Sequence, residues 1–304
     1  MMIDLHTHIW QYPDHVGKEF AAEASSSCGR STDSDPNLYV TPEVHWKAYA
    51  NSAAAQVVVL AFRSRHLEVN VPNELVAEYV RQHPDRLVGF AAVDPSDPDP
   101  AGELEHAVKN LHLRGLKLSP VYQNFQLMDP RVQPVYKMAE QLGVPILFHM
   151  GAAFVRRAPM KFGHPEQLED VALAFPDLKI CIAHMGHPWQ LETIVLLRKH
   201  PNVYADLSAL HSHAWELYNT LRMALEYGVL HKLFFGTDFP FHTAEQTISG
   251  LMRASELAQT ARLPEIPRER IKEIIHHNSL RTLGIERVCD GVQLRCVAPA
   301  PSLS

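Results

Sequence analysis

Short apolar runs rich in β-branched and aromatic residues alternate with longer segments of helical periodicity along most of the chain. This alternation is typical of repeated strand–helix units, in which each helix returns the chain to the start of the next parallel strand. Eight such runs predict strands at residues 2–8, 56–62, 87–93, 114–119, 144–150, 178–184, 202–207 and 232–238. Helices are predicted between them at residues 42–53, 72–82, 99–111, 130–142, 165–175, 188–199, 214–227 and 244–261, with a closing helix at 267–277.

Eight strand–helix units in one chain of 304 residues fit a (β/α)8 TIM barrel, an α/β fold in which parallel strands form a ring inside a layer of helices. A doubly wound sheet is the competing fold, but it would usually have fewer strands and a glycine-rich phosphate loop. The sequence contains no Gly-x-Gly-x-x-Gly or Gly-x4-Gly-Lys-Ser/Thr string. We therefore expect a barrel that forms a single domain over residues 1–287.

The connection between the first two predicted strands, residues 9–40, is the longest in the chain and is rich in Ser, Gly, Asp and Pro. A long loop at the catalytic end of a barrel is more often a lid or a specificity insertion than a separate domain. We expect such a loop insertion here. Residues 288–304 are expected to form a loosely ordered C-terminal tail.

Composition and charge disfavour several classes of protein. The formal net charge of −6 gives no long-range attraction to nucleic acid or to an anionic membrane. No stretch is long and apolar enough for a membrane span, and the first residues resemble no secretory signal. The four cysteines form no Cys-x-x-Cys pair. We expect a cytoplasmic protein with a small-molecule substrate as its partner; the oligomeric state stays open, and a homodimer is compatible with the sequence.

The string Asp4-Leu5-His6-Thr7-His8 occupies the first predicted strand. Alternate residues of a strand share a face, so His6 and His8 can bind one metal ion, with Asp4 deeper on the same face. Two half-buried histidines without a ligand would be the alternative. The metal site is favoured because four ionisable residues end later strands: Lys117, His149, His184 and Asp238. In a barrel these strand ends converge on one rim, where the active site lies.

Five strings in this order resemble the amidohydrolase superfamily: Asp-Leu-His-Thr-His, Gly115–Leu118, Pro145–His149, Ala183–Gly186 and Gly236–Pro240. The resemblance extends from residue 2 to about residue 285 and is strongest to the amidohydrolase-2 branch, which contains enzymes like aminocarboxymuconate-semialdehyde decarboxylase. It implies that the metal ligands are His6, His8, His149 and Asp238. It also implies that His184 binds a second metal or polarises the substrate, and that Lys117 occupies a position that some relatives carbamylate. Because this branch commonly binds one ion, one is favoured over two.

The residue types alone also support metal chemistry. Three neutral imidazoles and one carboxylate suit a divalent ion, with zinc as the first expectation and manganese and iron as alternatives. Such an ion lowers the pKa of bound water to about 7. Asp238 would then accept the proton of the attacking water, and His184 would donate a hydrogen bond to the carbonyl oxygen. We expect a metal-dependent hydrolase of an amide, lactone or ester bond in a small organic molecule.

Three other functions remain open. The first is a nonoxidative decarboxylase, in which Asp238 or His184 would manage the proton on carbon; release of carbon dioxide without incorporation of water would distinguish it. The second is a phosphodiesterase like the TatD nucleases, although those have a glutamate near the position of Lys117 and the charge balance predicts no basic groove. The third is a metal-binding scaffold without catalysis.

Candidates for binding the substrate lie in the loops that follow the strands. They are Tyr122, Arg156, Trp189 and His242. An arginine could bind a substrate carboxylate through two parallel hydrogen bonds, although solvated loop arginines are more frequent. Lys117 must be paired or modified, because a lone buried ammonium group is costly. The same reasoning from strand ends adds weaker candidates: His187, His211, His213, Arg63, Arg65 and Arg157.

Overall fold

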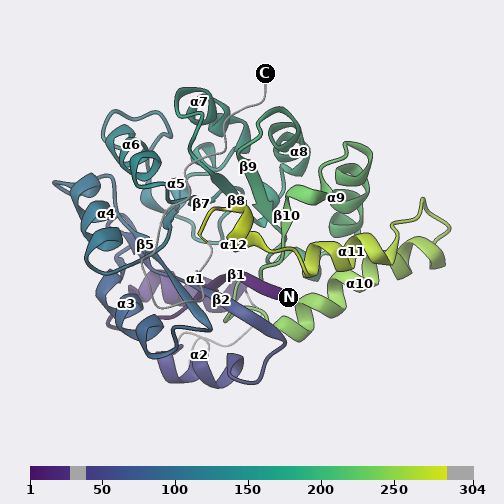
Figure 1. Cartoon of the computed structure of the whole chain (residues 1–304), viewed down its shortest axis with the longest axis horizontal. Coiled ribbons are helices and arrows are strands. Elements are labelled where there is room, and N and C mark those ends of the chain that lie inside the picture. Colours follow the sequence, from purple (N-terminus) through teal and green to yellow (C-terminus); the bar gives the residue numbers. More distant parts are fainter. Residues whose placement is uncertain (28–38, 286–304) are drawn as a thin grey trace.

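The computed structural model describes residues 1–27 and 39–285. Eight parallel strands follow one another around a ring with the helices outside it (Figure 1). In order, the strands are β1 (Met2–His8), β2 (Ala54–Leu60), β5 (Leu87–Ala92), β6 (Leu116–Leu118), β7 (Ile146–His149), β8 (Ile180–Ala183), β9 (Val203–Asp206) and β10 (Leu233–Phe234). The predicted (β/α)8 barrel is therefore confirmed, and each observed strand lies within or overlaps its predicted range.

Hydrogen bonds between β1 and the segment after β10 close the ring. Leu5 N donates to Phe235 O at 3.1 Å, and His8 N donates to Phe239 O at 2.8 Å. In the other direction, Asp238 N donates to His6 O at 2.9 Å. The last strand, β10, is only two residues long, and residues 235–239, which have no regular secondary structure, complete the barrel.

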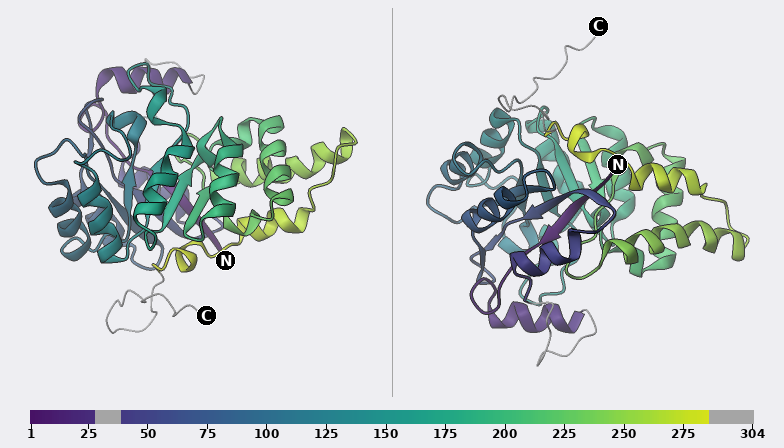
Figure 2. Two further views of the ribbon diagram at one scale, coloured as in Figure 1. Left: turned by 90° about the horizontal axis from the view of Figure 1, so that it is seen from above. Right: turned by 60° about the horizontal axis from the view of Figure 1, so that its bottom comes forward.

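The helices cover the outside of the ring, and a long pair, α10 and α11, projects to one side (Figure 2). The α-helices are α1 (Lys18–Ser27), α2 (Pro42–Tyr49), α3 (Asn73–Gln82), α4 (Pro100–Lys109), α5 (Pro120–Gln123), α6 (Gln133–Leu142), α7 (Leu168–Ala174), α8 (Gln190–Lys199), α9 (Ala214–Glu226), α10 (Ala244–Thr260), α11 (Arg268–Ile275) and α12 (Ser279–Thr282). Short 3-10 helices are η2 (Met160–Phe162), η3 (Pro165–Gln167), η4 (His184–Gly186), η5 (Leu210–Ser212) and η6 (Leu230–Lys232). No helix in the described ranges is long and apolar enough to cross a membrane.

The structure contains elements that the pattern did not predict, including the short helices α5 and α12. A hairpin of β3 (Phe62–Ser64) and β4 (Val69–Val71) follows β2. Helix α1 occupies part of the predicted loop 9–40, and it lies across the end of the barrel opposite the N-terminus (Figure 2). Its buried side chains include Phe20, Ala21 and Ala24, too few apolar residues to give a helical period. The predicted tail, residues 288–304, lies outside the described residues.

A β-bulge in β1 corrects one prediction from the alternation rule. Asp4 pairs with Val57 and Thr7 with Val59, so β1 contains one more residue than β2 over this stretch. A bulge shifts the side-chain alternation by one residue. Leu5 packs in the interior cluster with Phe234, while Asp4 accepts a hydrogen bond at 2.7 Å from Tyr49 Oη of α2, one of the helices outside the ring. Asp4 therefore does not share a face with His6 and His8.

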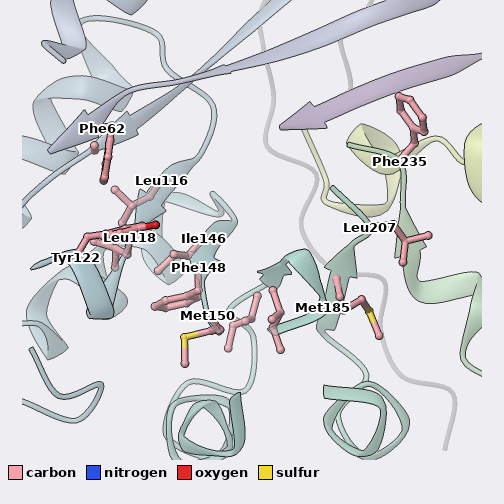
Figure 3. Close-up of a cluster of buried hydrophobic side chains, with 14 of the residues drawn as sticks. Phe62, Leu116, Leu118, Tyr122, Ile146, Phe148, Met150, Met185, Leu207 and Phe235 are labelled. Atoms are coloured by element: carbon pink, nitrogen blue, oxygen red, sulfur yellow. The ribbon is translucent and has the colours of Figure 1, made fainter. Parts of the chain in front are cut away.

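Two apolar layers hold the barrel together. The interior layer includes Leu5, Leu60, Phe90, Leu147 and Phe234. The larger outer layer packs strands against helices, and Figure 3 shows the part of it that contains Leu116, Leu118, Ile146 and Phe148. Because Lys117 lies between the outward residues Leu116 and Leu118, its own side chain is directed to the barrel interior.

His45 of α2 provides a test of this packing. It is fully buried between Tyr79 Oη, 2.8 Å from its Nδ1, and Thr7 Oγ1, 2.9 Å from its Nε2. Burial lowers the pKa of His45 to about 3. In the unfolded chain the histidine binds a proton below about pH 6.5, so its contribution to stability is complete above that pH and is lost as pH falls toward 3.

As the pH falls from about 6.5 to about 4, the free energy of unfolding should decrease less steeply in His45→Gln than in the parent protein. The two slopes should differ by about 1.4 kcal/mol per pH unit, because the variant lacks the histidine that gains a proton only in the unfolded chain. Denaturant titration at several pH values measures this slope. Tyr79→Phe is the control, because it removes a hydrogen bond but retains the imidazole, and it should keep the parent slope. An unchanged slope in His45→Gln would show that His45 is not held neutral.

Candidate active site

Three potential metal ligands meet at the carboxyl end of β1. His6 Nε2 and His8 Nε2 lie 3.3 Å apart, and Asp238 Oδ1 lies 3.4 Å from the first and 3.5 Å from the second. Tetrahedral coordination with bonds of about 2.1 Å places neighbouring ligand atoms about 3.4 Å apart. The three side chains therefore already have the spacing of ligands around one divalent cation.

The second ring nitrogen of His6 contacts a carboxylate. His6 Nδ1 lies 3.0 Å from Asp206 Oδ2 at the end of β9, and both side chains are buried. A carboxylate that binds one ring nitrogen fixes the tautomer and leaves the other nitrogen as a metal ligand. Burial raises the pKa of Asp206, but His6 and the hydrogen bond from Ser208 Oγ outweigh it, so this pKa lies below the usual range. Asp206 is therefore an anion that orients His6.

The segment after β10 that closes the barrel, residues 235–239, is called the closure segment, and it positions Asp238 beside His6 and His8. Thr237 donates from its N and its Oγ1 to the Asp4 carboxylate, at 3.0 and 2.8 Å. Asp238 itself has a φ of 63°, in the left-handed region that costs energy for a residue other than glycine. Burial raises the pKa of Asp238, but the neighbouring imidazoles, led by His6 and His8, lower it well below its usual value. Asp4 thus anchors the turn that carries Asp238.

His184 and His149 adjoin this cluster. The His184 ring stacks on His6 with centroids 4.8 Å apart, and a nitrogen of each lies within 4.8 Å of an Asp238 oxygen. The His149 ring contacts His184 at 5.1 Å, while its Nε2 lies 3.3 Å from the carbonyl oxygen of Ala152. His184, rather than the predicted ligand His149, therefore joins His6 and Asp238 in a group of described residues that could hold one ion.

The imidazoles are in the form that binds metal. Burial lowers the pKa of His6 to about 3, and it lowers the pKa of His8 and of His149 below the usual value as well. Neutral imidazole is the ligand form of histidine. In addition, His8 Nδ1 is buried without a hydrogen-bond partner among the described residues. The donor set fits a divalent cation.

Lys117 lies at the base of the cluster. Its Nζ is 3.2 Å from His6 Nε2, and the side chain is buried. Burial lowers the pKa of the Lys117 ammonium group to about 8, although the carboxylates of Asp206 and Asp238 oppose the shift. An ammonium group here offers a substrate carboxylate both charge and hydrogen bonds. Carbamylation of Lys117 stays a prediction.

A cavity of about 160 Å³ opens above these residues. Its walls are largely aromatic, because Trp10, Phe20, Phe62, Phe154 and Phe241 line it. Its floor and sides also contain polar side chains: His6, His8, Lys117, Ser119, Tyr122, His149, His184, His187, Ser208, His213 and Asp238. A small apolar pocket with a few convergent polar groups is the usual form of a small-molecule site.

Part of this wall comes from the insertion after β1. Phe20 of α1 packs against Phe62, Tyr122 and Phe154, with ring centroids 5.6 to 6.1 Å apart. Two contacts attach α1 to the loop after β7: Arg157 donates to Glu19 Oε2 at 3.0 Å, and Arg156 N donates to Glu23 Oε2 at 2.8 Å. Helix α1, which belongs to the described part of the insertion, is thus part of the cavity wall.

The structure does not bring every candidate substrate residue to the cavity. Tyr122, His187 and His213 line it, whereas Arg156, Trp189, His242 and His211 do not. Arg156 is exposed, Trp189 packs on His164, and His242 contacts His211. The other three arginines are paired: Arg63 and Arg65 with Asp97, and Arg157 with Glu19.

Sequence reasoning missed Asp206 and Ser208. Asp206 ends the seventh strand and Ser208 lies two residues beyond it. Among strands five to eight, this was the one strand to which no ionisable residue had been assigned. The signal was available, because an Asp-x-Ser string ends the run Val203–Asp206. Ser208 Oγ lies 2.8 Å from His184 Nδ1 and 3.2 Å from His6 Nδ1, so these two residues link both imidazoles.

Comparison with known proteins finds relatives by sequence and by fold. The gamma-resorcylate decarboxylase of Rhodococcus jostii is 24% identical over 253 residues, which cover 63% of this chain and 73% of the relative. A probable 2-pyrone-4,6-dicarboxylic acid hydrolase of Acinetobacter baumannii has a TM-score of 0.64 at 18% identity, covering 93% of this chain and 99% of the other. A dihydroxybenzoic acid decarboxylase of Polaromonas, solved with manganese and 2-nitroresorcinol, has a TM-score of 0.62 at 18% identity, covering 94% and 98%.

At these identities the solved structures show the shared fold alone. The sequence profile of the amidohydrolase family, by contrast, matches residues 3–285, which is nearly the whole described chain. The match includes both ends of the barrel closure and every residue of the cluster around His6. This chain therefore belongs to the amidohydrolase family, in its amidohydrolase-2 branch.

Proposed function

We propose that the protein is a metal-dependent nonoxidative decarboxylase of a small aromatic acid with a hydroxyl group next to its carboxylate. The observation that carries this proposal is the cavity, which joins aromatic walls to a floor of potential metal ligands. Its volume of about 160 Å³ is close to that of a cavity of about 150 Å³ that accepts a benzene ring. The relative from Rhodococcus is named for a reaction of this class.

The charges of the cavity also favour a substrate with one acidic group. Lys117 is its one lysine, and no arginine occurs among the described residues that line it. A dicarboxylate would leave a second anionic group without a cationic partner in an apolar site, which is unfavourable. The substrate carboxylate would lie near Lys117 and the metal ligands, and the ring would lie between aromatic side chains such as Phe62 and Phe154.

His6, His8 and Asp238 would hold the divalent ion, with His149 or His184 as a further ligand. When bound, the ion supplies a Lewis acid that attracts the carboxylate and the adjacent oxygen of the substrate. Zinc was the expectation from the donor types, but the relative from Polaromonas was solved with manganese, so we propose manganese as the first metal to test. One ion per chain remains the prediction.

Asp238 would move the proton. Its low pKa keeps it ionised at neutral pH, so it can accept the proton of the substrate hydroxyl and return it to the ring carbon that bears the carboxylate. The bond between that carbon and the carboxylate then breaks, its electron pair returns to the ring, and carbon dioxide leaves. The phenolate product takes a proton from solvent.

Hydrolysis is the competing function, because the same cluster could activate a water molecule and because a probable hydrolase shares the fold. We expect the manganese-loaded protein to release carbon dioxide from a panel of hydroxybenzoates without incorporating ¹⁸O from labelled water into the organic product. Gas-phase mass spectrometry measures both. Hydrolysis of lactones or esters with ¹⁸O incorporation, and no carbon dioxide from any hydroxybenzoate, would establish the hydrolase instead.

Asp238→Asn should lower kcat for carbon dioxide release by about 10²–10⁴-fold, because an amide can neither accept nor return the proton. Metal content is measured on the same sample, so that loss of the ion is separated from loss of proton transfer. Asp170→Asn on the exposed face of α7 is the matched control and should leave kcat unchanged. Full turnover by a metal-loaded Asp238→Asn protein would refute the assignment.

Asp206→Asn should weaken metal binding by about 10–100-fold, because His6 loses the carboxylate that orients it. Competition with a fluorescent chelator measures the metal Kd without any substrate. Asp170→Asn again serves as the control. If Asp206→Asn binds manganese as tightly as the parent, the carboxylate does not support the ligand set.

A further inference from the structure

A second group of polar side chains lines the cavity outside the metal-ligand cluster. His187 and His213 both line it, and their ring centroids lie 5.3 Å apart. His187 is about a third exposed and contacts Glu216, which belongs to the first turn of α9. The reaction proposed above assigns no role to any of these residues.

The backbone fixes His187 at this position. The turn before it contains His184 and Met185, whose φ values of 55° and 53° are unusual for residues other than glycine. Ala152 N donates to His187 O at 2.7 Å. A Cβ atom on Gly151 would lie 2.2 Å from that oxygen, so only glycine permits the contact. The loop at Gly151 and the turn at His184 and Met185 therefore both fix the backbone of His187. The two positive φ values in this turn are strained conformations next to the cavity.

The side chain of His187 is also held in one orientation. His187 Nδ1 lies 2.5 Å from Glu216 Oε1, and Gln190 Nε2 donates to the same oxygen. An ionised carboxylate only accepts hydrogen bonds, so Nδ1 carries the proton. Nε2 is then the ring nitrogen available to a ligand, and it has no hydrogen-bond partner among the described residues. A histidine oriented by a carboxylate in this way resembles a binding group more than a solvated surface residue.

We propose that His187 is a specificity-determining residue that hydrogen-bonds a second hydroxyl group on the aromatic substrate, away from the metal ligands. This inference rests on the proposed function. A hydroxyl both donates and accepts, so it can pair with Nε2 in either protonation state. His213, whose ring centroid lies 5.3 Å away, is the other imidazole on this side of the cavity, whereas Phe154, Leu210 and Phe241, which also line the cavity, offer no side-chain hydrogen bond. A site built to bind a hydroxyl discriminates strongly against the analogue that lacks it.

The test compares 2-hydroxybenzoate with the 2,3-, 2,4-, 2,5- and 2,6-dihydroxybenzoates by calorimetric titration of the manganese-loaded protein. We expect the parent to bind at least one dihydroxybenzoate about tenfold more tightly than 2-hydroxybenzoate, which is the effect of one added hydrogen bond. In His187→Phe the preference should disappear while the Kd of 2-hydroxybenzoate stays within about twofold of the parent value. The KM values for carbon dioxide release should follow the same pattern.

Two further variants complete the experiment. Glu216→Ala retains the imidazole but removes the acceptor that orients it, and it should weaken the preference without changing 2-hydroxybenzoate binding. His231→Phe, exposed before β10 at the other end of the barrel, is the control and should keep the preference.

Two outcomes are decisive and distinguishable. If the parent does not prefer any dihydroxybenzoate over 2-hydroxybenzoate, or if the preference survives in His187→Phe, the proposed role of His187 is wrong. In that case binding and turnover of 2-hydroxybenzoate would still support the decarboxylase proposal. Failure of all these acids to bind or react with the metal-loaded protein overturns both.

Discussion

The hydrogen bonds that join β1 to the segment after β10 are the interaction on which the site depends. They bring His6 and Asp238, which are separated by most of the chain, into direct contact, and Asp238 N donates to His6 O. Asp4 reinforces this joint through Thr237. Burial raises the pKa of Asp4 to about 6, against the hydrogen bonds that it accepts from Tyr49 and Thr237. The ring of strands and the geometry of the cluster around His6 are thus stabilised together.

Much of the fold could be predicted from the sequence because strand and helix have different periods, and the eight apolar runs are separated by helical segments with clear ends. The position of the site followed from the same pattern, because parallel strands end at one rim. His6, His8, Lys117 and Asp238 do meet within a few ångströms. Their roles as ligands or catalysts remain predictions.

What the pattern missed depends on tertiary contacts. The bulge that turns Asp4 away from His6 arises from pairing with β2, which no single strand reveals. Arg63, Arg65 and Arg157 pair with acidic residues, as Arg157 does with Glu19, and their loop positions alone could not show that no arginine would line the described cavity. The expected hydrolysis rested on the ligand types, which both reactions share, whereas the proposed decarboxylation rests on the volume and aromatic walls of the cavity.

Helix α1 places Phe20 in the cavity from outside the strand–helix repeats. The residues that would hold the metal come from the ends of β1, β7 and β8 and from the closure segment, so they do not depend on the length or composition of this insertion. Evolution can therefore alter which rings fit by changing one peripheral helix, while the proposed ligands and proton carrier stay constant. Substrate range and chemical mechanism are separable properties in such an architecture.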